Sequence, residues 1–248
     1  MKISIITVSF NAADTISRTL ASVRDQTYTN IEHVVIDGNS TDETLSIIKS
    51  YKHVNQFISE TDNGMYNALN KGIKLASGDY VGILNADDIL HSNDVIETLV
   101  HHIKESQKDL YYGDIRFTST KNPNRTLRYY SSAKFHPSKF EKGYMPAHPS
   151  VYIKNSLFDE LGLYKEDYEI AADYELLIRY LYTNKVSYQY IPLLMVDMQP
   201  GGRSNTSWKS RYTLNKEIVR GCRENGISTN MAKLSMKYFR KIFEYMPR

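Results

Sequence analysis

Short apolar segments alternate with segments of helical spacing through the first 120 residues, and this alternation limits the fold more than any other feature. The apolar segments are rich in β-branched and aromatic residues, as buried strands are. They cover residues 3–10, 32–37, 55–59, 80–85 and 109–117. Strands alternating with helices predict an α/β protein of right-handed βαβ units, with a mainly parallel sheet flanked by helices. In such a sheet, ligands bind beyond the carboxyl ends of the strands.

Two helix starts are predicted from residues that follow these strands. Asp14 precedes an apolar stripe and fits an N-cap. Ser40, followed three residues later by Glu43, fits a capping box at the start of the next helix. Both signals place a helix directly after a strand, as the βαβ pattern requires.

The pattern changes near residue 118. The segment 118–150 is rich in turn formers and aromatic residues and has no clean period. Long irregular segments of this kind in a compact domain are often functional. Helical spacing returns at 172–185, a strand-like segment follows at 186–198, and two helices are predicted on either side of 224–229.

Length and cysteine content limit the class of protein. A chain of 248 residues with 41% hydrophobic residues can build one large domain, or a domain with an appendage. No apolar run approaches the roughly 20 residues that span a bilayer, and the first residues lack the features of a signal peptide. The single cysteine, Cys222, allows no intrachain disulfide. We therefore expect a cytoplasmic protein.

The net charge of +3 is unevenly distributed. Residues 1–200 contain 20 Lys and Arg against 25 Asp and Glu, a balance of −5. Residues 201–248 contain 11 against 3, a balance of +8. Such asymmetry predicts that the C-terminal segment faces an anionic partner, either a membrane surface or a nucleic acid.

Carboxylates stand where two predicted strands end and where a later helix begins: Asp37, the adjacent Asp87 and Asp88, and Asp173. Each alone also fits a local role, as an Asx turn or a helix cap. Together they fit a sharper chemistry. One carboxylate accepts a hydrogen bond from a uracil ring, a pair binds Mg²⁺ or Mn²⁺, and a third removes a proton from a hydroxyl group.

Three quoted segments resemble family 2 glycosyltransferases, which have the GT-A fold. They are "ISIITVSFNAADTISRTLASVRDQTYTNIEHVVIDGNSTDET", "SETDNGMYNALNKGIKLASGDYVGILNADD" and "AHPSVYIKNSLFDELGLYKEDYEIAADYELLIRY". The resemblance covers about residues 1–200 and is closest to bacterial enzymes of O-antigen, capsule or colanic-acid synthesis. It implies a GT-A catalytic domain over 1–205, with a nucleotide-binding half over 1–115 and an acceptor-binding half over 116–205. A basic helical extension would follow over 206–248.

The resemblance implies roles for residues of the donor site. Thr7, Ser9 and Phe10 would line the uridine pocket, and Asp37 would pair with the uracil. Further donor contacts would come from five residues: Asp62, Lys71, Asn85, Ala86 and Asp87.

The segment Asn85–Asp88 occupies the place of the family's Asp-x-Asp metal motif. Because Asn85 replaces its first acid, we expect Mn²⁺ or Mg²⁺ to depend on Asp87, with Asp88 the next candidate. Asp173 falls where the family has its general base. His148 and Arg203 match loops near the acceptor or the diphosphate.

These roles imply an inverting, metal-dependent transfer from a UDP-sugar to a saccharide on undecaprenyl diphosphate. The alternatives are a non-catalytic sugar-nucleotide-binding or scaffold protein and another class of nucleotide-dependent enzyme. Four acidic positions together count against the first. The second is disfavoured because the first strand lacks a Gly-x-Gly-x-x-Gly turn and no Gly-Lys-Ser/Thr sequence is present.

The last 18 residues, 231–248, predict a basic helix with aromatic residues on its apolar face. This pattern is typical of helices that lie on membrane surfaces, although a helix docked on the catalytic domain also fits. We expect peripheral association with the cytoplasmic face of the inner membrane. Nucleic-acid binding is not expected, since no known recognition module is present.

Overall fold

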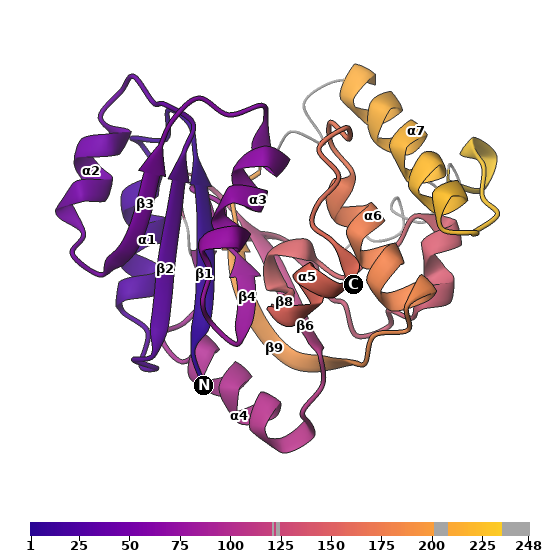
Figure 1. The fold of residues 1–248 in the computed structure, drawn as a ribbon, viewed down its shortest axis with the longest axis horizontal. Helices are drawn as coiled ribbons and strands as arrows, with labels where there is room; N and C mark the ends of the chain where they lie inside the picture. The colour runs from indigo at the N-terminus through magenta and orange to yellow at the C-terminus, as the bar shows by residue number, and fades with distance from the viewer. Residues whose placement is uncertain (121, 123–124, 201–207, 235–248) are drawn as a thin grey trace. The chain divides into compact units, whose positions relative to one another are not determined.

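A computed structural model describes residues 1–120, 122, 125–200 and 208–234 of the chain (Figure 1). The described residues form a nine-stranded sheet with the order β3-β2-β1-β4-β8-β6-β9-β5, and β7 pairs with β6 at one side. The strands are β1 (Ile3–Ser9), β2 (Ile31–Asp37), β3 (Val54–Ser59), β4 (Tyr80–Ile83), β5 (Ile89–Leu90), β6 (Leu110–Thr118), β7 (Thr126–Tyr130), β8 (Tyr152–Lys154) and β9 (Tyr188–Met198).

Helices connect most of these strands. The α-helices are α1 (Ile16–Arg24), α2 (Thr44–Ser50), α3 (Met65–Leu75), α4 (Val95–Ser106), α5 (Ser156–Leu161), α6 (Ala172–Ile178) and α7 (Trp208–Glu224). Two 3₁₀ turns, η1 (Pro137–Lys142) and η2 (His148–Ser150), lie in the irregular segment, and a π-helical turn, η3 (Arg179–Thr183), continues α6.

Six strands share one direction, which confirms the predicted mainly parallel α/β sheet. β3, β2, β1 and β4 pair in parallel, and β6 pairs in parallel with β9. β8 is antiparallel to both β4 and β6, so β6 runs in the direction of β4. The carboxyl ends of β1, β2 and β4 therefore open at one edge, where Ser9 is in register with Asp37.

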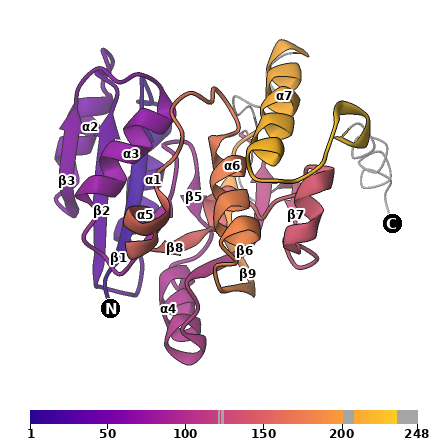
Figure 2. The same ribbon diagram turned by 45° about the vertical axis from the view of Figure 1, so that its right-hand side comes forward.

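Helices cover both faces of the parallel strands (Figures 1 and 2). On one face, Ile16 and Leu20 of α1 and Ile48 of α2 pack with Val35. On the other face, α3 approaches closely because Gly72 has no side chain. A Cβ atom there would lie 2.5 Å from Ile6 Cγ2. The successive side chains of β2 thus enter opposite cores, as strand alternation requires.

Both predicted caps are wrong. The N-cap of α1 is Thr15 rather than Asp14, and no side chain caps that helix. The N-cap of α2 is Glu43, and the Ser40 hydroxyl is instead hydrogen-bonded to Asp37. A buried carboxylate needs donors more than an exposed helix end does, since water can satisfy the latter.

The chain divides into two compact units. The first unit comprises residues 1–133, 146–164 and 187–200 and contains the whole sheet. The second unit comprises 134–145, 165–186 and the described part of 201–248, including α6 and α7. The domain boundaries expected from the sequence stay a prediction. In the described parts of the chain, no helix combines the length and apolar character needed to cross a membrane.

Candidate active site

The carboxylate of Asp37 closes β2 in a fully buried position. Its Oδ1 accepts hydrogen bonds from Ser9 Oγ at 3.0 Å and Ser40 Oγ at 2.5 Å. Its Oδ2 accepts from the Ser40 amide at 2.9 Å and Ser59 Oγ at 2.8 Å. Two carboxylate oxygens offer about four acceptor positions, so these donors fill them. Asp37 therefore joins the ends of β1, β2 and β3, and its predicted contact with uracil stays a prediction.

Gly38, which follows Asp37, lies between two predicted donor-site residues. A Cβ atom on Gly38 would lie 2.7 Å from Asp62 Oδ2 and 3.4 Å from the Phe10 ring. Phe10 is 65% exposed, whereas Asp62 is half-buried and accepts a hydrogen bond from the Gly64 amide at 2.8 Å. The structure thus brings Phe10, Ser9, Asp37 and Asp62 together at the carboxyl edge. A side chain at Gly38 would therefore push the Asp62 carboxylate out of its position.

Thr7 lies on the same face of β1 as Ser9 but has a different partner. Its hydroxyl is 3.0 Å from Nε2 of His33, whose Nδ1 is 3.1 Å from Nε2 of His53. Burial, with a smaller contribution from His53, lowers the pKa of His33 to about 3. His33 is therefore neutral at physiological pH, and Thr7 is hydrogen-bonded within the sheet. Its contact with uridine stays a prediction.

Helix α3 carries the predicted residue Lys71 and, through Asn70, supports the predicted residue His148. Lys71 forms an ion pair with Glu60 at 2.7 Å. Asn70, one residue earlier, hydrogen-bonds both the amide and the carbonyl of Tyr164, at 3.0 and 2.9 Å. The Tyr164 hydroxyl in turn lies 2.7 Å from Nε2 of His148. α3 therefore fixes Tyr164, and Tyr164 orients the imidazole of His148.

The segment after β4 places Asn85, Asp87 and Asp88 in unequal surroundings. Asp88 is 1% exposed, and its Oδ2 accepts a hydrogen bond from Asn85 Nδ2 at 3.2 Å. Its Oδ1 is buried and has no hydrogen-bond partner among the described residues. Ala86 is buried against Val35, whereas Asp87 is exposed to solvent.

The pKa values of both carboxyl groups are raised. Burial, together with the negative charge of Asp87, raises the pKa of Asp88 well above its usual value, although the hydrogen bond from Asn85 and the nearby Gln199 backbone lower it. Partial burial of the carboxyl group also raises the pKa of Asp87, although that side chain as a whole is exposed. Two adjacent acids that form no ion pair with a described residue favour binding of a cation.

These residues fit a hard divalent cation. An unpaired buried carboxylate oxygen beside a second carboxylate is a ligand set for Mg²⁺ or Mn²⁺. No cluster of three or more His, Cys, Asp or Glu side chains suited to a metal ion occurs in the described parts of the chain. Two carboxylates suffice where water and substrate phosphates supply the other ligands.

The remaining predicted residues lie outside the first unit. Asp173 is the second residue of α6 in the second unit, partly exposed, and its Oδ1 accepts a hydrogen bond from the Tyr174 amide at 2.8 Å. Arg203 lies outside the described residues.

Sequence reasoning did not identify four of the residues that shape the site, namely Gly38, Ser40, Ser59 and Tyr164. The Asp-Gly-Asn-Ser sequence after β2 indicated a tight turn and could have identified Gly38 and Ser40. Nothing local to Ser59 or Tyr164 marks them, because their partners are about 20 and 94 residues away in the chain.

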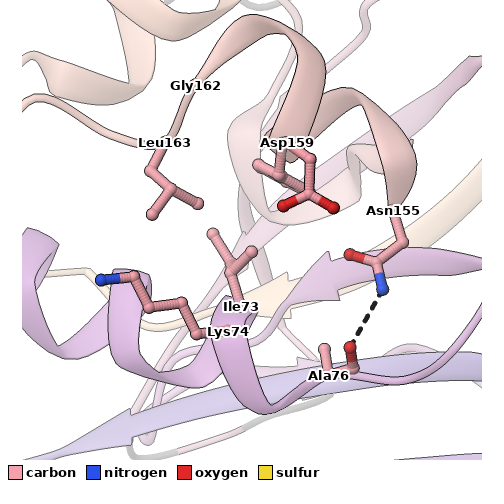
Figure 3. A pocket seen from close by; sticks show the side chains of 8 residues that line it. Ile73, Lys74, Ala76, Asn155, Asp159, Gly162 and Leu163 are labelled. Atoms are coloured by element: carbon pink, nitrogen blue, oxygen red, sulfur yellow. Dashed lines mark hydrogen bonds between the residues drawn. The ribbon is translucent and has the colours of Figure 1, made fainter.

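A cavity of about 450 Å³ lies away from these residues, between the end of α3 and α5 (Figure 3). Its lining includes Lys74, Ile73 and Asp159, and Asn155 Nδ2 donates to the Ala76 carbonyl at 3.0 Å on one side. None of the predicted site residues lines it. The cavity is separate from the candidate active site.

Comparison with known sequences decides the family. Residues 4–161 match the family described as "Glycosyl transferase family 2". The chain belongs to glycosyltransferase family 2. It is 30% identical over 209 residues to a "PGL/p-HBAD biosynthesis glycosyltransferase" of Mycobacterium bovis, covering 82% of this chain and 79% of that protein. It is 34% identical over 182 residues to an uncharacterized glycosyltransferase of Mycobacterium tuberculosis, covering 71% of this chain and 68% of that protein. The predicted enzyme class, a glycosyltransferase, is confirmed.

Solved structures share the fold. S. aureus TarS 1-349, in complex with UDP-GlcNAc, superposes with a TM-score of 0.70 at 19% identity, over 92% of this chain and 68% of that one. The mannosyltransferase PcManGT of Pyrobaculum calidifontis, in complex with GDP-Man and Mn²⁺, gives 0.65 at 18% identity, over 90% and 63%. The family 2 glycosyltransferase therefore has the GT-A fold that its sequence predicted.

Proposed function

We propose that this glycosyltransferase moves a sugar from a UDP-sugar to a lipid-carrier-linked saccharide, with inversion and with Mn²⁺ or Mg²⁺. The unpaired, buried Oδ1 of Asp88 beside Asp87 is the observation on which the proposal rests. Such an oxygen is costly unless a cation or donor occupies it. TarS and PcManGT, which share the fold, have structures in complex with UDP-GlcNAc and with GDP-Man and Mn²⁺.

The proposal gives the metal to Asp87 and Asp88. Asp88 would bind it directly, because its buried Oδ1 has no hydrogen-bond partner in the described part of the chain and Asn85 orients the same carboxylate. Asp87, open to solvent, would bind directly or through water. When bound, the cation offsets the charge that grows on the leaving diphosphate.

The uridine would lie at the carboxyl edge of β1 and β2. Phe10 offers an exposed aromatic ring, and Asp62 a half-buried carboxylate on the other side of Gly38. A uracil N–H reaching Asp37 would replace one of its serine donors, most readily Ser59, which is only partly buried. Lys71, Ser9 and Thr7 would support this pocket.

Asp173 would remove the proton from the acceptor hydroxyl. The oxygen would attack the anomeric carbon opposite the diphosphate, so one displacement inverts the configuration. A UDP-α-sugar would give a β-linked product. His148, oriented by Tyr164, would border the donor sugar and acceptor, and Arg203 would approach the diphosphate.

The acceptor would be a saccharide on undecaprenyl diphosphate, in bacterial surface polysaccharide synthesis of the O-antigen or capsule type. The enzyme would be cytoplasmic and peripheral on the inner membrane, held through the basic segment 231–248, of which only 231–234 are described.

The experiment is the substitution Asp173→Asn, assayed for sugar transfer and for UDP binding. Loss of a general base lowers transfer by about 10²- to 10⁴-fold. UDP affinity should stay within about twofold of wild type, because an interaction used only in the transition state changes turnover and not binding. Glu169→Gln makes the same chemical change at an exposed acid nearby and should be active. Normal transfer by Asp173→Asn would refute the base assignment.

A further inference from the structure

The loop that leads into α6 is held by one carboxylate from α7. Glu217 Oε1 accepts a hydrogen bond from the Glu169 amide at 2.7 Å. Its Oε2 accepts from the amides of Ile170 and Ala171, both at 2.9 Å. All of these residues belong to the second unit, and Figure 2 shows α7 alongside α6.

These three bonds hold the backbone immediately before α6, and the bond from the Ala171 amide also serves the start of the helix, where no local side chain acts as a cap. The first amides of a helix have no partner within it, and a nearby side chain usually satisfies one of them. The N-cap residue of α6 is Ala171, whose side chain cannot accept a hydrogen bond. Glu217 instead brings a negative charge to the positive end of the helix, and charge-assisted bonds of this kind are short and strong. The backbone is thereby fixed up to two residues before Asp173.

Partly exposed ion pairs also link α7 to the loop before α6. Lys165 lies 3.0 Å from Glu175 of α6 and 2.8 Å from Glu224 of α7. Burial opposes the charge on Glu224, but hydrogen bonds from Lys165, Arg220 and Tyr168 lower its pKa to about 2. Glu224 is therefore ionised throughout the physiological range and forms ion pairs with Lys165 and Arg220.

The two helices also approach closely at one point. Gly221 of α7 faces Glu175 of α6, and a Cβ atom on Gly221 would lie 3.4 Å from Glu175 Cβ. Glu175 itself is fully buried and paired with Arg179 at 3.0 Å. A shift of α7 along α6 would therefore disturb buried ion pairs, so α7 gives Glu217 a fixed position.

We propose that Glu217 is a positioning residue of the transfer reaction: it sets the place of the Asp173 carboxylate by holding amides 169–171. The inference rests on the proposed role of Asp173 as base. It assigns a function to α7, which lies beyond the residues 4–161 that match the family. A base misplaced by about 1 Å costs on the order of 10²-fold in rate, so such a support affects turnover directly.

The test compares Glu217→Gln with Glu224→Gln and Asp173→Asn in the full chain. Glu224→Gln is the matched control, because it makes the same acid-to-amide change on α7 and breaks ion pairs but leaves amides 169–171 bonded. UDP release is followed with Mn²⁺, using whichever of UDP-glucose, UDP-galactose, UDP-N-acetylglucosamine and UDP-N-acetylgalactosamine the wild type consumes fastest. Hydrogen exchange of residues 165–176 and the melting temperature are measured on the same samples.

We expect Glu217→Gln to lower kcat about 10- to 100-fold with the donor KM within about twofold, and to speed exchange at 169–171. Glu224→Gln should lower the melting temperature at least as much but kcat by less than about threefold. Wild-type kcat in Glu217→Gln, or equal loss in both variants, would overturn the positioning role. Full turnover by Asp173→Asn would instead overturn the proposed base.

Discussion

Two carboxylates at the carboxyl edge of the same sheet have opposite surroundings. Asp37, at the end of β2, is fully buried and accepts four hydrogen bonds. Asp88, just beyond β4, is also buried, but one of its oxygens has no partner among the described residues and its neighbour is another acid. Burial is nearly the same in both, so the two carboxylates differ in their hydrogen bonds and in the charge beside them.

The difference in hydrogen bonding indicates that the Asp37 and Asp88 carboxylates have different roles. A buried charge with a full set of donors is tolerated and fixes the groups around it, whereas an unpaired one lowers stability unless something binds there. Asp37 therefore holds three strand ends together. We propose that Asp88 lowers the stability of the free protein and in return binds a cation.

Replacement of Asp37 should cause the largest loss in the free energy of unfolding. Asp37→Ala leaves three hydroxyl groups and one amide without their acceptor and should lower the free energy of unfolding by about 3 kcal/mol. Asp37→Asn, which keeps one acceptor oxygen, should cost about half as much. Urea unfolding measures both changes. A loss below about 0.5 kcal/mol in Asp37→Ala would show that the four hydrogen bonds do not stabilise the fold.

A third carboxylate, Glu32 at the amino end of β2, should stabilise the fold to an extent that depends on pH. Burial opposes its charge, but hydrogen bonds from Ser4 and Ser77 and the nearby Lys2 lower its pKa from 4.5 to about 2. Because the folded pKa lies below the unfolded one, this stabilisation is complete above about pH 4.5 and is lost as the pH falls toward 2. The free energy of unfolding gained from this carboxylate is about 2 kcal/mol once solvent screening of the partly exposed Lys2 pair is allowed for.

Glu32→Gln isolates that contribution. The variant should lose about 2 kcal/mol near pH 7 relative to wild type, and the gap should close as the pH falls toward 2. Unfolding by urea across this pH range measures the gap. A gap that is constant with pH would mean that the charge of Glu32 is not responsible.

Replacement of Asp88 should change the stability in the opposite direction. Asp88→Asn removes a buried charge while keeping the shape, and should raise the stability of the metal-free protein by about 1 kcal/mol near pH 7. Since the folded pKa of Asp88 is raised, the gain should appear only as the pH rises above its ordinary value of 3.8. Thermal unfolding in a metal chelator measures it. A loss of stability of the same size would make Asp88 a structural residue like Asp37.

The sequence predicted the parallel strands and the acidic positions because both depend on local pattern. Each strand from β1 to β4 was recognised from its β-branched run, and Asp37 and Asp88 from their places at strand ends. The caps were wrong because Ser40 bonds to a tertiary partner rather than to its own helix.

The surroundings of the acids could not be predicted. The contrast between Asp37 and Asp88 depends on Ser9 and Ser59, which come from neighbouring strands. The bond from Glu217 to the start of α6 joins residues 46 to 48 positions apart in sequence. Periodicity and capping rules describe only local structure, so contacts of this range appear only once the chain is folded.

In the proposed reaction, Asp88 binds a divalent cation that joins the enzyme to a nucleotide diphosphate. Calorimetric titration of UDP with and without Mn²⁺, on wild type and on Asp88→Asn, tests it most directly. We expect Mn²⁺ to raise the UDP affinity of wild type about 10- to 100-fold. The UDP affinity of Asp88→Asn should change by less than about twofold when Mn²⁺ is added. Equal enhancement by Mn²⁺ in both proteins would contradict the claim.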